Sequence, residues 1–119
     1  MSEVITTKAT PDTQSSLVRA LNDQFRQSFV GGMVMVTNGT NALSEPEKLA
    51  VMNKVRSFDA FTPDNDPHGE HDFGSFKHKA DTYFWKIDCY DLQMLAHSPD
   101  PTDPNVTKRV LTIMKAEEY

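Results

Sequence analysis

Residues 71–90 read HDFGSFKHKADTYFWKIDCY, and this stretch decides the fold. Two runs rich in aromatic residues flank a polar turn at 78–81, a pattern typical of a β-hairpin. A two-residue turn at 79–80 pairs Gly74 with Trp85 and Phe73 with Lys86. Because a glycine opposite a tryptophan leaves room for the indole, we favour this register over its neighbours.

Alternation along the second run then assigns side chains to the two faces of the sheet. Trp85, Ile87 and Cys89 fall on the core face, so we interpret Cys89 as a buried structural thiol. If the first strand begins at His71, the same register places this imidazole opposite Asp88 on the other face. We therefore expect His71, Asp88 and Lys86 to lie within contact distance of one another.

That group of three has two interpretations. A carboxylate can orient an imidazole as a general base while a lysine stabilises an anion, so His71, Asp88 and Lys86 are candidate catalytic residues of a small hydrolase or transferase. The alternative is a solvent-exposed ion pair between Lys86 and Asp88, a kind of contact that contributes little.

The rest of the chain supplies two amphipathic helices and two further strands. We expect a helix over 11–29, with Leu17, Leu21, Phe25 and Phe29 recurring every four residues, and a second helix that a Ser44–Glu47 capping box begins. The strands are expected at 33–37 and 107–116, with a short helix at 91–97. This order predicts a two-layer α+β fold, a mainly antiparallel four-stranded sheet with two main helices on one face.

Length and composition restrict the class of protein. The 119 residues predict a single domain over 10–119, preceded by a flexible arm at 1–9. One cysteine excludes an internal disulfide and a zinc site built from several thiolates. No apolar run approaches the roughly 20 residues that cross a bilayer. The first residues lack the pattern of a signal peptide, so we expect a cytoplasmic protein without a membrane partner.

The acidic charge is concentrated in one part of the chain. The net charge is −5, and residues 59–103 hold ten acids against three lysines. Direct binding to nucleic acid requires the opposite sign, whereas an acidic surface can meet a basic protein. The candidate partner-binding residues are Asp64, Asp66, Glu70, Asp100 and Asp103. The simpler interpretation is a well-solvated surface.

A metal site is a weaker interpretation of the same region. His68, Glu70, His71 and Asp72 are ligand types suited to zinc or manganese, but their spacing matches no established ligand motif. We therefore expect no metal and no other cofactor.

Four stretches also resemble the signature blocks of the bacterial domain of unknown function family 3768. They are NDPHGEHDFG at 65–74, WKIDCYD at 85–91, SPDPTDP at 98–104 and RVLTIM at 109–114, while LND at 21–23 and FR at 25–26 are similar to the family's opening. The resemblance implies no established reaction. It implies a gene carried on plasmids and integrated elements, where counter-defence functions are common.

Together, the charge and the resemblance predict a small acidic interaction protein rather than an enzyme. It would be a counter-defence inhibitor of the anti-CRISPR or anti-restriction type that binds a basic surface of a nucleic-acid-handling host complex. The hydrolase or transferase remains the alternative, and an oligomerising structural protein is a third; the oligomeric state is not readable from the sequence.

Overall fold

The computed structural model describes residues 11–119. The predicted arm at 1–9 lies outside the described residues. The helices are α1 (Pro11–Ser28), α2 (Asn38–Asn41) and α3 (Glu45–Arg56), and the strands are β1 (Met33–Val36), β2 (Phe73–His78), β3 (Asp81–Tyr90) and β4 (Lys108–Lys115). Two short 3-10 turns, η1 (Pro104–Val106) and η2 (Ala116–Glu118), flank β4.

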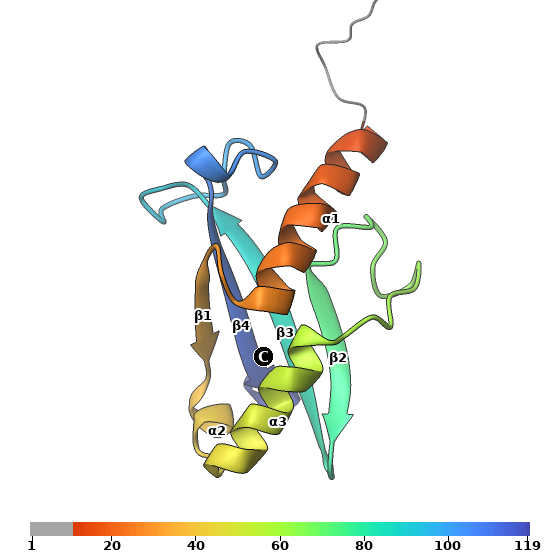
Figure 1. Cartoon of the computed structure of the whole chain (residues 1–119), viewed down its shortest axis with the longest axis vertical. Helices are drawn as coiled ribbons and strands as arrows, with labels where there is room; N and C mark the ends of the chain where they lie inside the picture. Colours follow the sequence, from red (N-terminus) through yellow and green to blue (C-terminus); the bar gives the residue numbers. More distant parts are fainter. Residues whose placement is uncertain (1–10) are drawn as a thin grey trace, which may run out of the picture.

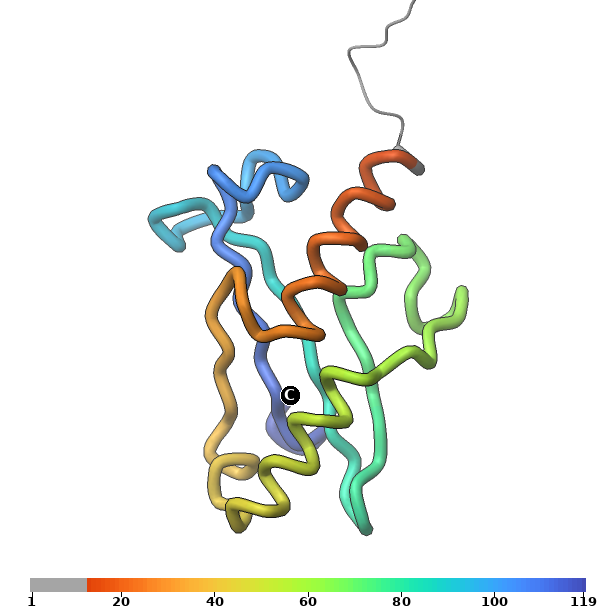
Figure 2. Tube along the Cα trace, viewed as in Figure 1, coloured from red at the N-terminus to blue at the C-terminus, as the bar shows by residue number. Residues whose placement is uncertain are grey.

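The four strands form one sheet in the order β1-β4-β3-β2. β1 runs parallel to β4, and the other two pairs are antiparallel. Helices α1 and α3 cover one face of this sheet (Figures 1 and 2). The core lies between the layers, where Trp85, Leu111 and Ile113 are fully buried. The predicted α+β fold with a mainly antiparallel sheet is confirmed.

The predicted hairpin register is also confirmed. Gly74 pairs with Trp85 and Phe73 with Lys86. A Cβ atom on Gly74 would overlap the indole of Trp85, so glycine is required by close approach at this position.

The start of β2 differs from the prediction. The strand begins at Phe73, because His71 adopts a left-handed backbone with φ of 52° and cannot continue an extended run. The carbonyl of Asp72 still accepts a hydrogen bond from the amide of Ile87 (2.8 Å). The ladder therefore ends before it can bring His71 opposite Asp88.

Helix α1 buries a different face from the one that its leucines indicate. Leu17 is 47% exposed, whereas Asn22 and Arg26 are each 1% exposed. Phe25 packs into the core as predicted. The amino-terminal half of α1 extends past the sheet and lies beside loops instead (Figure 1). Asn22 and Arg26 lie in the carboxy-terminal half, and they are buried against backbone carbonyls, that of Glu70 in the loop before β2 and those of Val55 and Arg56 at the end of α3.

The helix expected at 91–97 does not form. Asp91 Oδ1 accepts the amide of Leu95 (3.0 Å), and Met94 has a positive φ of 62°. Tyr90 and His97 form an isolated antiparallel bridge. This bridge folds the segment back on itself, so it closes as a tight turn.

Replacing Gly74 with alanine tests the packing that sets the register. We expect Gly74→Ala to lower the free energy of unfolding by about 1–3 kcal/mol, because the new methyl group overlaps the buried Trp85 indole. Urea unfolding measures the change, with exposed Ser75→Ala on the adjacent position as the matched control. When Trp85→Phe and Gly74→Ala are combined, the loss of stability should be smaller than the sum of the two separate losses, because the smaller ring leaves room for the new methyl group. Strict additivity of the two changes would contradict the packing explanation.

Candidate functional site

One end of the molecule gathers most of the residues that the sequence singles out. Here the amino-terminal half of α1 meets two loops, residues 57–72 before β2 and residues 91–107 after β3 (Figure 1). We call this region the loop end. Neither loop has regular structure beyond the η1 turn, so side chains add to the isolated backbone hydrogen bonds that hold both loops, such as those from the Asp66 amide to the Thr62 carbonyl (2.8 Å) and from the Ser98 amide to the Cys89 carbonyl (2.9 Å).

A buried amide–guanidinium contact joins both loops to α1. Nε of Arg109 donates to Oδ1 of Asn22 (2.9 Å), and Nδ2 of Asn22 donates to the carbonyl of Glu70 (2.9 Å). The guanidinium of Arg109 also donates to the carbonyl of Pro101. Asn22 is 1% and Arg109 4% exposed. This contact therefore connects α1, β4 and both loops through two buried side chains.

A second polar chain holds His71 against α1. Arg26 donates to Asp23 Oδ1 (3.0 Å) and to the carbonyl of Val55 (2.9 Å). Asp23 Oδ1 lies 2.8 Å from Nδ1 of His71. The imidazole stacks on the ring of Phe61, with centroids 3.6 Å apart and planes at 3°. Arg26 thus links α3 to the 57–72 loop through α1.

The expected catalytic group of three is not assembled. His71 contacts α1 on the helix-covered side, whereas Lys86 and Asp88 form an ion pair (2.9 Å) on strand positions of the opposite face. The prediction that these three residues lie together is therefore wrong, since it assumed an extended backbone through His71. Nε2 of His71 also faces Oδ2 of Asp66 (3.5 Å), so carboxylates flank both ring nitrogens.

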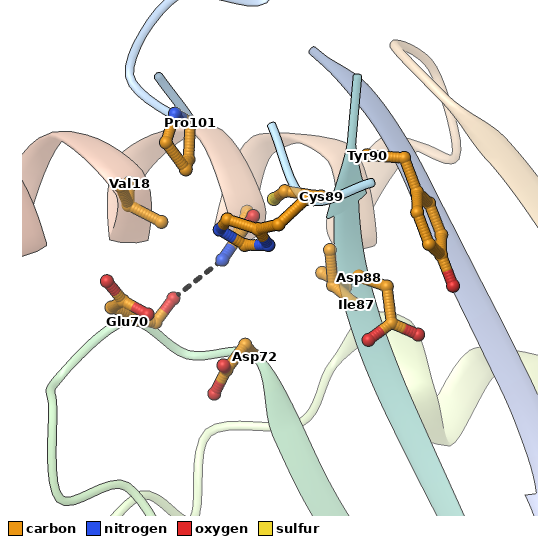
Figure 3. A pocket seen from close by; sticks show the side chains of 10 residues that line it. Val18, Glu70, Asp72, Ile87, Asp88, Cys89, Tyr90 and Pro101 are labelled. Carbon is orange, nitrogen blue, oxygen red and sulfur yellow. Dashed lines mark hydrogen bonds between the residues drawn. The ribbon is translucent and has the colours of Figure 1, made fainter. Parts of the chain in front are cut away.

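A cavity of about 240 Å³ opens between α1, the end of β3 and the two loops. Figure 3 shows Glu70 and Asp72 on the loop that forms one wall, and Ile87 and Cys89 on the strand that forms another. The remaining lining residues are Val18, Asn22, Asp88, Tyr90, His97 and Pro101.

Three ionisable groups of this cavity, Glu70, Asp72 and Cys89, have pKa values that are raised. Burial, followed by repulsion from Asp72, raises the pKa of Glu70. Burial likewise raises the pKa of Asp72. Burial also raises the pKa of the Cys89 thiol, which disfavours the nucleophilic thiolate. The cavity is therefore an environment in which carboxylates lack compensation, and its cysteine is a poor nucleophile.

The five acids predicted to bind a partner have different environments. Asp64 is exposed and Glu70 lines the cavity. Asp66 accepts the amide of His71 (3.1 Å). Asp100 accepts the amide and hydroxyl of Thr102, and Asp103 accepts the amide of Asn105. Three of the five, Asp66, Asp100 and Asp103, therefore cap local backbone.

The metal candidates His68, Glu70, His71 and Asp72 do not form a ligand cluster. Within residues 11–119, no three His, Cys, Asp or Glu side chains gather where they could hold a metal ion. The same part of the chain has no helix with the length and apolar character of a membrane span.

Sequence reasoning missed the residues that organise the loop end, namely Asn22, Asp23, Arg26, His97 and Arg109. A signal for four of them was present, because they lie in the stretches 21–23, 25–26 and 109–114 that carry the family resemblance. Their partners are carbonyls and side chains distant in sequence, so spacing alone could not assign their roles.

Comparison with known proteins identifies one family. The model of the family described as "Protein of unknown function (DUF3768)" matches residues 36–118, well over half of the chain. No curated protein and no solved structure matches the chain. The match begins at the last residue of β1, so it covers the two loops and strands β2, β3 and β4 but not the helix α1 that holds the loops.

Asn22→Ala tests the buried contact. The change leaves the Arg109 guanidinium short of a buried acceptor, and we expect the free energy of unfolding to fall by about 1–3 kcal/mol. Amide hydrogen exchange should also accelerate at 69–72 and 100–103. Exposed Gln24→Ala on the same helix is the control, with a change within about 0.5 kcal/mol. Equal behaviour of the two variants would show that the contact does not hold the loops.

The raised pKa of Glu70 gives a pH-dependent prediction. Because the folded-state pKa lies above the unfolded value, the ionised carboxylate lowers stability at neutral pH, and this cost is absent below the unfolded-state pKa of about 4.3. Glu70→Gln should therefore raise the urea midpoint at neutral pH, with a gain that shrinks toward zero as the pH falls below that value.

Glu118 is the matched control with the opposite sign. Hydrogen bonds from the Thr37 hydroxyl and then the Gly39 amide lower its pKa, so its stabilisation is present above the unfolded-state pKa and is lost as the pH falls through the folded-state pKa. Glu118→Gln should lower the midpoint at neutral pH. Changes of the same sign in the two variants would contradict the assignment.

Proposed function

The chain belongs to the DUF3768 family of proteins of unknown function, and from this premise we propose that it is a small interaction protein whose acidic loop end binds a basic surface of a protein partner. The observation that carries the proposal is the separation of charges at this end. Its arginines are engaged within the molecule, while within residues 11–119 the carboxylates of Asp59, Asp64, Glu70 and Asp72 accept no hydrogen bond from another residue and form no ion pair.

The engaged cations are readily traced. Arg19 donates to the carbonyl of Gly69 (3.0 Å), and Arg109 donates to Asn22 and Pro101. Lys86 pairs with Asp88. In contrast, Asp59 and Asp64 are exposed, and within residues 11–119 their carboxylates accept no hydrogen bond and form no ion pair; the backbone carbonyl of Asp59 accepts the amide of Phe61 (2.9 Å). The loop end therefore presents net negative charge on loops that α1 holds in place.

Preorganised charge of this kind supports recognition more than catalysis. Electrostatic complementarity raises association rates and selects partners, and fixed loops lose little conformational entropy on binding. The hydrolase or transferase alternative depended on His71 acting beside Asp88 and Lys86, which are not assembled. Because Asp23 and Asp66 flank its two ring nitrogens, His71 has no free nitrogen to offer a substrate.

More specifically, we propose that the partner is a nucleic-acid-handling complex of a host defence system, of the CRISPR or restriction type. Such complexes carry basic grooves for a phosphate backbone, and carboxylates held on an ordered surface can occupy the same positive potential. A gene carried on a mobile element and action in the cytoplasm are part of this proposal.

Phage plating tests the proposed function. Expression of the chain in a host with an active CRISPR or restriction system should raise the plating efficiency of a targeted phage. Asp59→Lys combined with Asp64→Lys should reduce that effect by about tenfold or more, because steering by charge is reversed at the loop end. These two residues lie outside the cavity, and within residues 11–119 their carboxylates have no hydrogen bond or ion pair to lose.

The control makes the same change of charge elsewhere. Glu45→Lys combined with Glu117→Lys alters two exposed acids near α3 and η2, away from the loop end, and should retain the effect. No increase in plating across the defence systems would overturn the counter-defence proposal. An unchanged effect of the loop-end variant would overturn the role of the acidic surface.

A further inference from the structure

We propose that the cavity at the loop end is a binding pocket for one cationic side chain of the partner, a lysine ammonium or an arginine guanidinium, with Glu70 and Asp72 as its counter-charges. This inference rests on the proposed function and names the chemistry that its site recognises. Four observations support it: the volume of the cavity, its apolar walls, the negative charge of its lining residues, and the lack of hydrogen-bond or ion-pair partners for the Glu70 and Asp72 carboxylates within residues 11–119.

The volume suits a side chain. Pockets for drug-sized ligands span roughly 300–1,000 Å³. The cavity holds about 240 Å³ and opens to the surface between the two loops. It is therefore small for a metabolite but large enough for a single long side chain inserted from outside.

The walls suit an aliphatic stem. Val18, Ile87 and Pro101 contribute hydrocarbon on different elements, α1, β3 and the 91–107 loop (Figure 3). Lysine and arginine bury their methylene groups along apolar surface while the charged head reaches polar groups. An inorganic cation would gain nothing from these walls, so the lining favours an organic one.

The sign of the lining is negative. No lysine or arginine lines the cavity among the described residues, and its acids are Glu70, Asp72 and Asp88. Asp88 is already paired with Lys86. His97 is the one lining group able to carry positive charge within the cavity. Two carboxylates therefore remain available to a cation.

The same two carboxylates differ from the other acids of the loop end. Asp66, Asp100 and Asp103 each accept hydrogen bonds that close a loop or turn. Within residues 11–119, the carboxylates of Glu70 and Asp72 accept no hydrogen bond from another residue and form no ion pair. Partial burial and then repulsion from Asp72 raise the pKa of Glu70, and a cation bound between the two carboxylates would relieve both costs.

Model side chains test this inference directly on the full chain. N-acetyl-arginine methylamide and N-acetyl-lysine methylamide are titrated into the 15N-labelled protein, and amide shifts are followed at 70–72 and 87–90. Both probes should give saturable shifts there, with dissociation constants on the order of millimolar for a single charged group. The neutral isostere N-acetyl-citrulline methylamide should give none. The relative affinities of the two cations identify the preferred side chain.

Two double variants, each of which removes two negative charges, locate the site. Glu70→Gln combined with Asp72→Asn should weaken binding by about tenfold or more, since the charge-assisted contacts are lost. Asp59→Asn combined with Asp64→Asn should leave the affinity nearly unchanged. His97→Gln should leave binding intact, because within residues 11–119 the imidazole forms no hydrogen bond or ion pair with either carboxylate. Urea unfolding confirms that each variant is folded.

The outcomes separate this inference from the proposed function. Equal shifts with citrulline, retained affinity in the Glu70/Asp72 variant, or saturation by Mg²⁺ but by neither organic probe would each overturn the pocket. Its failure would leave the plating result of the Asp59/Asp64 variant unaffected. Conversely, saturable binding of the arginine or lysine probe supports the pocket even if phage plating identifies no defence target.

Discussion

The loop end depends on one buried contact, the hydrogen bond from Arg109 to Asn22. A guanidinium removed from water is costly unless its donors are satisfied, so the fold must supply acceptors wherever Arg109 is buried. It supplies the amide of Asn22 and the carbonyl of Pro101, and Asn22 in turn fixes the carbonyl of Glu70. One constraint on β4 therefore positions α1 and both loops, and it places the cavity between them.

The same requirement explains why α1 buries polar residues against expectation. An apolar helix face needs an apolar surface, but the amino-terminal half of α1 extends beyond the sheet. The carboxy-terminal half instead meets backbone carbonyls of the 57–72 loop and of the last turn of α3, and buried backbone groups must be paired. Asn22 and Arg26 supply hydrogen-bond donors to these carbonyls. Arg26 donates to the carbonyl of Val55, and its Cζ also lies 5.1 Å from the centroid of the Trp85 ring. The helix thus buries polar and apolar side chains next to one another, with Asn22 and Arg26 on either side of the core residue Phe25.

Local rules predicted the sheet but not the site, for a physical reason. The pairing of Gly74 with Trp85 follows from volume and alternation, which are properties of neighbouring residues, and it was predicted correctly. The position of His71 depends on a single backbone torsion, and a positive φ at a non-glycine residue has no reliable local signature. Asp23 is 48 residues from His71 along the chain, a separation that periodicity cannot bridge. The sequence showed that the loops are acidic. Only the folded structure shows which of their carboxylates accept hydrogen bonds and which do not.

That division also decides how the net charge should be understood. An acid that caps a turn stabilises the loop conformation and adds to the negative electrostatic potential of the loop end. It cannot move toward a ligand without breaking the turn. An acid without a partner contributes to the same field and is free to form a short, directional contact. At the loop end the first kind surrounds the second, so bonded aspartates preorganise the loops on which Glu70 and Asp72 lie beside the cavity. Such an arrangement selects a cation by position as well as by charge, which a uniformly acidic surface does not.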